Sequence, residues 1–132
     1  MARVLSLDTS FLIDVERERP TGDGPAHRFL RGAPEAELAL SAVALGELAE
    51  GFGDEDHPVL VALRQGHRIL PVDEGVALAY ATIARALRAG GRLIGANDLW
   101  IAATSLHHGL PLVTADVEHF RRVDGLQVVS YR

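Results

Sequence analysis

The sequence predicts an α/β fold, in which a mostly parallel sheet carries helices on both faces. Short apolar segments alternate with helical patterns along the whole chain, and this alternation is typical of strands joined by crossover helices. The first, fourth and fifth apolar segments are nearly continuous apolar runs, as expected of strands buried on both faces. The 132 residues have the size of one domain and contain no long linker, so we expect a single domain over residues 1–132.

About five short strands are expected. The first ends directly at an acid, Asp8, and the third is closed by Pro71, which has no N–H to donate to a neighbouring strand. The five predicted strands are Val4–Leu7, Leu38–Leu40, Arg68–Leu70, Leu112–Val113 and Leu126–Val129.

Helices are expected between the strands. The longest is capped by Asp73 and ends at Gly90-Gly91, and along it Val76, Tyr80, Ile83 and Leu87 recur with the spacing of one helical face. Asp56 is a candidate cap for the helix that begins at Pro58. The remaining predicted helices are Ser10–Glu16, Ala26–Arg31, Ser41–Glu50, Pro58–Gln65, Asn97–His108 and Val117–Arg121.

Composition excludes several classes of function. The chain has no cysteine, which excludes disulfides, thiolate metal sites and a cysteine nucleophile. All 13 of its Lys+Arg residues are arginine, and without lysine the chain is neither a P-loop NTPase nor a Schiff-base enzyme. No apolar run is long enough for a membrane span or a signal peptide, so we expect a cytoplasmic protein without a membrane partner. The net charge of −5 by itself argues against a nucleic-acid partner.

Four acids are predicted to lie near one edge of the sheet. Asp8 and Asp116 follow the first and fourth strands, Glu47 lies in the helix after the second strand, and Asp98 opens the helix that precedes the fourth. Taken singly, each could be a helix cap, a turn residue or a solvated side chain. Ligands of such sheets bind outside the carboxyl ends of the strands, and carboxylates that converge there repel one another unless a cation lies among them. Carboxylates suit Mg²⁺ or Mn²⁺, so the pattern predicts a site for one of these ions.

These motifs resemble those of the PIN-domain nucleases, and within them the VapC toxins of type II toxin–antitoxin pairs. The resemblance extends from the opening strand to Leu126–Val129. It implies a three-layer α/β/α sandwich with a five-stranded parallel sheet, and RNA cleavage dependent on Mg²⁺ or Mn²⁺. It also implies frequent homodimers and inhibition by a cognate antitoxin. The motifs that carry it are Asp8-Thr9-Ser10, Glu47, Asn97–Ala103 and Val113–Asp116.

The resemblance also assigns roles to single residues. The matches to the catalytic, metal-holding acids of the family are Asp8, Glu47, Asp98 and Asp116. Supporting polar contacts around them are expected from Thr9, Ser10, Asn97 and Thr114. In the RNA cleavage that this resemblance implies, an ion bound by carboxylates activates a water and screens the scissile phosphate.

The sequence contains no specific motif for contacts with partners. Arg85, Arg88 and Arg92 could contact RNA phosphates or simply form a solvated helix face. The apolar helix faces around Phe11–Val15 and Val43–Phe52 are candidates for an antitoxin groove or a dimer contact.

Aromatic side chains and histidines give no separate signal of function. Trp100 and Tyr80 are interpreted as packing residues, and His107, His108 and His119 as surface or packing residues.

Two other functions remain open. A Mg²⁺-dependent phosphatase with an aspartate nucleophile usually has a second acid two residues later, where Ser10 stands, and uses a lysine, which the chain lacks. An inactive relative of the same fold would only bind RNA or protein, and four intact acids argue against it. If those four charges belong to one site, the rest of the chain carries only −1 of the total of −5. The acidity then no longer excludes an RNA substrate.

Overall fold

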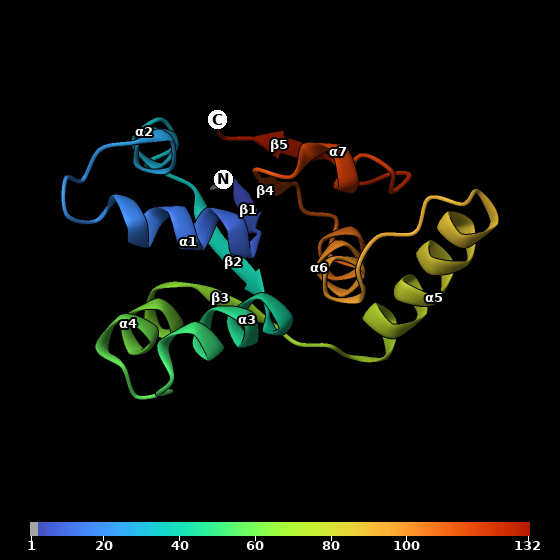
Figure 1. Cartoon of the computed structure of the whole chain (residues 1–132), viewed down its shortest axis with the longest axis horizontal. Coiled ribbons are helices and arrows are strands. Elements are labelled where there is room, and N and C mark those ends of the chain that lie inside the picture. Colours follow the sequence, from blue (N-terminus) through green and yellow to red (C-terminus); the bar gives the residue numbers. More distant parts are fainter. Residues whose placement is uncertain (1–2) are drawn as a thin grey trace.

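The computed structural model describes residues 3–132 and contains one five-stranded sheet flanked by helices (Figure 1). The strands are β1 (Val4–Leu7), β2 (Glu37–Ser41), β3 (Arg68–Leu70), β4 (Leu112–Thr114) and β5 (Val128–Ser130). The helices are α1 (Thr9–Glu18), α2 (Pro25–Arg31), α3 (Ala42–Phe52), α4 (Pro58–Gly66), α5 (Glu74–Ala89), α6 (Ala96–His107) and α7 (Val117–Phe120).

All neighbouring strands are parallel, in the order β3-β2-β1-β4-β5. The chain moves outward from β1 to β3 and then returns across the sheet to β4 and β5. Helices α1 to α4 lie on one side of the sheet, and α5 and α6 lie on the other (Figure 1). The expected three-layer α/β/α sandwich is therefore confirmed. The strand order reverses between β1 and β4, where Leu7 pairs with Val113, and ligands of parallel sheets bind at such a point.

The central strands are buried from both faces. Leu5, Leu7, Leu112 and Val113 are at most 1% exposed, which explains the continuous apolar runs that predicted β1 and β4. They belong to a single hydrophobic core that also includes residues from the helices on both sides of the sheet. Among residues 3–132, no helix is long and apolar enough to cross a membrane.

Several element boundaries differ from those expected. The fifth strand begins two residues late, at Val128, because the segment before it makes turn hydrogen bonds, including Leu126 N–H to the Val123 carbonyl at 3.3 Å. Asp56 does not cap α4. Its own N–H instead donates to Asp54 Oδ1 at 2.9 Å in a local turn, and the cap moves to His57.

The amphipathic pattern of α5 is confirmed. Val76, Ile83 and Leu87 are buried, and Tyr80 is half-buried and stacked on Trp100 of α6, with ring centroids 3.9 Å apart. Both aromatic rings therefore pack between helices, as the sequence suggested.

Candidate metal centre

Asp8 lies at the end of β1, buried among hydroxyl groups. Its Oδ1 accepts the Thr9 N–H at 2.8 Å. Its Oδ2 accepts the hydroxyls of Ser10 at 2.9 Å and Thr114 at 2.7 Å. Burial, with added repulsion from Glu47, raises the pKa of Asp8 above its usual value even though these hydrogen bonds oppose the rise. The carboxylate is thus fixed in position but costly to keep charged.

Glu47 reaches the same place from the middle of α3. Its Oε1 accepts the Thr9 hydroxyl at 2.7 Å, and its Oε2 accepts the side-chain amide of Asn97 at 3.2 Å. Thr9 therefore contacts Glu47 through its hydroxyl and Asp8 through its backbone. The two contacts of Glu47 therefore join the starts of α1 and α6 to α3.

Asp98 lies in the first turn of α6 and differs from the other acids. Within residues 3–132 its carboxylate has no hydrogen-bond donor. Partial burial, and then repulsion from Asp8, Asp116 and Glu47 in that order, raises the pKa of Asp98 to about 6. A carboxyl whose pKa responds to three other acids lies in a region of concentrated negative charge.

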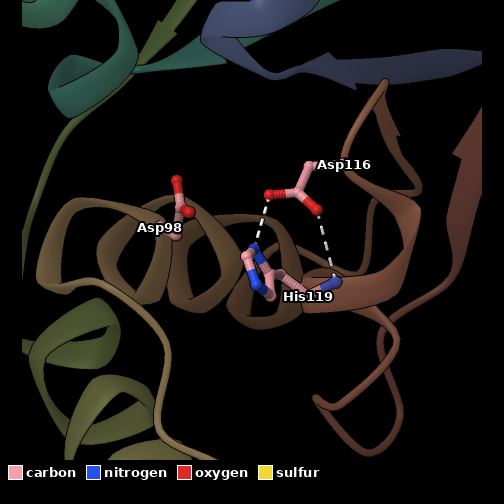
Figure 2. A group of neighbouring side chains, drawn as sticks. All are labelled: Asp98, Asp116 and His119. Atoms are coloured by element: carbon pink, nitrogen blue, oxygen red, sulfur yellow. Dashed lines mark hydrogen bonds and ion pairs between the residues drawn. The ribbon is translucent and has the colours of Figure 1, made fainter.

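Asp116 follows β4 and caps the short helix α7. Its Oδ2 contacts the His119 ring Nδ1 at 2.6 Å, and its Oδ1 accepts the His119 backbone N–H at 3.4 Å. Figure 2 shows the imidazole below this carboxylate and directed toward it, with Asp98 on α6 to one side. One ligand atom from each of Asp98, Asp116 and His119 lies within 4.8 Å of the other two.

His119 is the residue that sequence reasoning missed. The sequence indicates a surface or packing histidine, and the side chain is indeed 45% exposed, but it is paired with a carboxylate of the acid cluster. The signal available in the sequence is its position three residues after Asp116 at the start of a helix, where a side chain can turn back to the cap.

The structure brings together all eight predicted acids and supporting residues. The hydroxyl and amide groups of Thr9, Ser10, Asn97 and Thr114 each contact a carboxylate of the cluster. Beside it, Glu47, Asn97 and Asp98 line an open cavity of about 440 Å³ with the Gly95–Ala96 backbone. A substrate can therefore approach the carboxylates from solvent.

The three predicted RNA-contacting arginines lie outside this cavity. Arg85 and Arg88 are exposed on α5. Arg92 lines a separate cavity of about 390 Å³ with Arg122, whose guanidinium donates to the Arg92 carbonyl at 3.4 Å.

An apolar groove lies between α1 and α4. Phe11, Leu12 and Val15 of α1 line it together with Leu63 of α4, and its volume is about 230 Å³. A second hollow beside it is lined by exposed Ile13 and by Glu47 of the acid cluster, and both hollows share Leu48. The predicted apolar face of α1 is therefore partly uncovered.

The donor set of the cluster fits a divalent metal ion. Four carboxylates converge, and no arginine within residues 3–132 forms an ion pair with any of them. The imidazole of His119 is the basic side chain that contacts them. Oxygen ligands of this kind suit Mg²⁺ or Mn²⁺. The charge of such an ion would relieve the repulsion that, after burial, raises the pKa of Asp98.

Comparison with known proteins places most of the chain in one family. The PIN domain family matches residues 5–126. Ribonuclease VapC1 of Haemophilus influenzae is 32% identical over 129 residues, which cover 94% of this chain and 95% of that protein.

Solved structures agree with this likeness. The structure of VapBC-1 from nontypeable Haemophilus influenzae matches with a TM-score of 0.80 and 31% identity, over 97% of this chain and 98% of that one. VapBC-5 of Mycobacterium tuberculosis, a member of the VapBC family of toxin–antitoxin systems, matches with a TM-score of 0.66 and 27% identity, over 98% of both chains. From its sequence, its fold and its arrangement of acids, the chain belongs to the PIN domain family, among the relatives of the VapC ribonucleases.

Proposed function

We propose that this chain is an endoribonuclease toxin that depends on Mg²⁺ or Mn²⁺, with residues 1–132 acting as one nuclease domain in the cytoplasm. Asp8, Glu47, Asp98 and Asp116 would hold the ion. The observation that carries the proposal is the convergence of these four carboxylates, none of which forms an ion pair with an arginine within residues 3–132. Partial burial, and then repulsion from the other three acids, raises the pKa of Asp98 to about 6. Such an arrangement destabilises the metal-free protein, and a bound cation would offset this cost.

The surrounding residues would keep the carboxylates in position during the reaction. When bound, the ion lowers the pKa of a water and screens the negative charge of the scissile phosphate. Thr9, Ser10 and Thr114 hold Asp8 through three hydrogen bonds, so this carboxylate has little freedom to turn away. Glu47, held from both sides and lining the open cavity, would accept the proton of the attacking water as its oxygen bonds to phosphorus. The ribose oxygen, whose bond to phosphorus breaks, would take a proton from a solvent water.

RNA would bind weakly until the metal is present. The net charge of −5 gives little general attraction for phosphates. Arg85, Arg88 and Arg92 are exposed near the end of α5, and we propose that they contact phosphates beyond the cavity.

An antitoxin would bind in the apolar groove beside α1. The groove combines buried Phe11 and Leu12 with half-exposed Val15 and Leu63, which suits the apolar face of a partner helix. The adjoining hollow reaches Glu47, so a bound partner could extend to the metal site. The likeness to VapBC-5, which belongs to the toxin–antitoxin systems, supports this partner.

A charge placed in the groove would test this partner. Ala62 is exposed, lies on α4 and lines the groove, whereas Gln65 is exposed on the same helix and does not. We expect Ala62→Arg to abolish inhibition of RNA cleavage by a cognate antitoxin, and Gln65→Arg to preserve it. Equal inhibition of both variants would place the partner elsewhere.

We also propose a homodimer, as the resemblance implies. Sedimentation velocity at micromolar concentration should give about twice the chain mass of 14.2 kDa. A single species with the mass of the monomer would refute the dimer and leave the nuclease proposal intact.

The activity itself is tested by cleavage assays with Mg²⁺, Mn²⁺ and EDTA. We expect RNA cleavage that requires metal and is lost in Asp98→Asn. The matched control is Asp56→Asn, because Asp56 is an exposed acid in the turn before α4. Hydrolysis of p-nitrophenyl phosphate without RNA cleavage would instead support a phosphatase, and RNA binding without either reaction would support an inactive binding module.

A further inference from the structure

We propose that the cavity between the second half of α5, the end of α6 and the segment after α7 binds a base of the RNA substrate. The inference rests on the proposed function, because it names a second contact of the same RNA, away from the scissile phosphate. This base cavity has a volume of about 390 Å³, and its walls include Ile83, Leu87, Arg92, Leu106, Arg122 and Val123.

The interior of the base cavity is apolar. Ile83, Leu87 and Val123 are at most 6% exposed, and Leu106 is half-buried. The volume falls within the range of about 300–1,000 Å³ that is usual for small-ligand sites. Proteins that recognise single-stranded RNA hold bases that have left the stack, and such bases have apolar faces and polar edges. An apolar cavity of this size therefore suits a base better than it suits a phosphate.

The polar groups at the rim complement the rest of a nucleotide. Guanidinium planes stack on bases and bind phosphates, and the Arg92 guanidinium has no hydrogen-bond or ion-pair partner within residues 3–132. Arg122 lies 3.8 Å from Glu118, whose side chain is 87% exposed, so a phosphate can displace this weak ion pair. Asp124 is exposed and lines the cavity, where its carboxylate can accept an N–H from the edge of a base.

Arginines without partners gather around the base cavity. The guanidiniums of Arg85, Arg88, Arg92 and Arg121 are exposed and form neither an ion pair nor a hydrogen bond within residues 3–132. Arg85 and Arg88 lie on α5, and Arg121 ends α7. Among the other arginines that the structure describes, only Arg3 shares this property. Free guanidiniums attract phosphates, so we expect the RNA backbone to pass over this corner of the molecule.

Short segments of chain connect the base cavity to the acid cluster. Arg92 precedes Asp98 in the segment that leads into α6, and Arg122 follows Asp116 just beyond α7. Helix α7 has only 4 residues, so it is about 6 Å long at 1.5 Å per residue. An RNA strand whose scissile phosphate lies at the acid cluster can therefore place a nearby base in the cavity.

A bulky side chain at the mouth of the cavity tests this contact. Ala86 is exposed and lines the base cavity, whereas Ala89 is exposed on the same helix and does not line it. Ala86→Trp should block the cavity with an indole ring, and Ala89→Trp is the matched control that places the same ring outside it. Because both alanines are exposed, we expect both variants to unfold at nearly the same urea concentration as the unsubstituted protein.

Binding is measured by NMR of the methyl groups of the full chain in EDTA, so neither metal nor cleavage is needed. The probes are AMP, GMP, CMP and UMP, with ribose 5-phosphate as the probe without a base. We expect nucleotides to shift the methyl signals of Ile83, Leu87 and Val123, and ribose 5-phosphate to leave them unchanged. Nucleotide affinity should fall about tenfold in Ala86→Trp, as for the loss of an ordinary base contact, and should be retained in Ala89→Trp.

Cleavage of RNA in Mg²⁺ connects the cavity to the substrate. Ala86→Trp should raise the KM for single-stranded RNA about tenfold and leave kcat unchanged, because it removes binding that the substrate and the transition state share. Ala89→Trp should change neither constant.

Three results would overturn the inference. The first is the absence of methyl shifts with every nucleotide. The second is an equal shift with ribose 5-phosphate, because the site would then bind only the phosphate. The third is an unchanged KM in Ala86→Trp, because the RNA would then pass elsewhere. An unsubstituted protein that cleaves no RNA with either ion would instead refute the proposed function, whereas the NMR titration in EDTA would still decide whether the cavity binds nucleotides.

Discussion

The hydroxyl of Thr114 donates a hydrogen bond of 2.7 Å to Asp8 Oδ2, joining two residues that are 106 positions apart in the chain. The same hydroxyl oxygen accepts the backbone N–H of Asp116 at 2.9 Å. One buried hydroxyl at the end of β4 therefore fixes both an acid at the end of β1 and the backbone of a second acid. The parallel pairing of β1 with β4 makes this possible, because it brings their carboxyl ends together.

Replacing Thr114 with valine removes this hydroxyl while keeping the side-chain shape. We expect a loss of about 1–2 kcal/mol in the free energy of unfolding, because buried Asp8 loses a donor and the Asp116 N–H loses an acceptor. Mn²⁺ affinity should fall as well. Urea unfolding and calorimetry measure the two effects, and Thr114→Ser, which keeps the hydroxyl, should lose less of both. Unchanged metal affinity in Thr114→Val would show that Asp8 does not depend on this contact.

The raised pKa of Asp98 predicts a pH-dependent stability of the metal-free protein. The pKa of Asp98 is about 6 in the folded chain and 3.8 in the reference state. As pH rises between these values, the unfolded chain loses this proton first, and folding becomes less favourable. Asp98→Asn should therefore change stability little near pH 4 and stabilise the protein above about pH 6.

We expect that stabilisation to reach about 1–2 kcal/mol, less than the full pKa difference implies, because water screens the half-buried carboxyl. Urea unfolding in EDTA across this pH range provides the measurement. Asp56→Asn, at an exposed acid, should show no such pH dependence. A constant difference between Asp98→Asn and the unsubstituted protein would contradict the raised pKa.

Tyr131 anchors the final residues to α1. Its hydroxyl donates to Asp14 Oδ2 at 2.6 Å and lies 3.2 Å from the Ser10 carbonyl. We expect Tyr131→Phe to lower the free energy of unfolding by about 1–2 kcal/mol, because the buried Asp14 carboxylate loses a donor while the ring keeps its edge-to-face contact with Phe11. Urea unfolding measures the effect.

Tyr80→Phe is the matched control, because no hydrogen bond to the Tyr80 hydroxyl is found within residues 3–132. Its stability should change by less than about 0.5 kcal/mol. Equal stabilities of the two variants would show that the Tyr131 hydroxyl contributes nothing.

The arginines near the end of α5 should affect RNA binding and leave metal binding unchanged. For Arg88→Gln and Arg92→Gln we expect a higher KM for single-stranded RNA. The slope of log affinity against log salt concentration should become shallower by about 0.7 for each phosphate that is no longer neutralised. Cleavage rates at several salt concentrations measure this. Arg3→Gln is the control, because Arg3 is exposed and precedes the amino end of β1, opposite the end at which Asp8 lies. An unchanged KM in both α5 variants would exclude these contacts.

The fold and the positions of the acids were largely predictable from local patterns. Alternating apolar and helical segments predicted the five strands and the helices between them. Asp8 follows β1 and Asp116 follows β4, at the start of α7. The two acids lie near each other because the carboxyl ends of parallel strands meet at one edge of the sheet. The ends of elements were less predictable, as His57 shows by capping α4 in place of Asp56, because a cap depends on the turn that precedes it.

Side-chain partnerships across long stretches of chain required the folded structure. The contact of Thr9 with Glu47 depends on how α1 packs against α3, and the contact of Asn97 with the same carboxylate depends on α6. The pairing of His119 with Asp116 is local. The proximity of Asp98 to this pair depends on the packing of another helix, α6.

The sequence by itself determined the α/β architecture, the absence of cysteine and lysine chemistry, and the set of four acids. The tertiary structure decided which of those acids accept hydrogen bonds within residues 3–132 and which does not. Asp8 and Glu47 receive hydrogen bonds from neighbours. Asp98 is partly buried and meets three negative charges, which together raise its pKa to about 6. A pattern of residue types sets the hydrophobic burial that builds the sheet, but burial and repulsion at a carboxylate depend on distances between segments that only folding brings together.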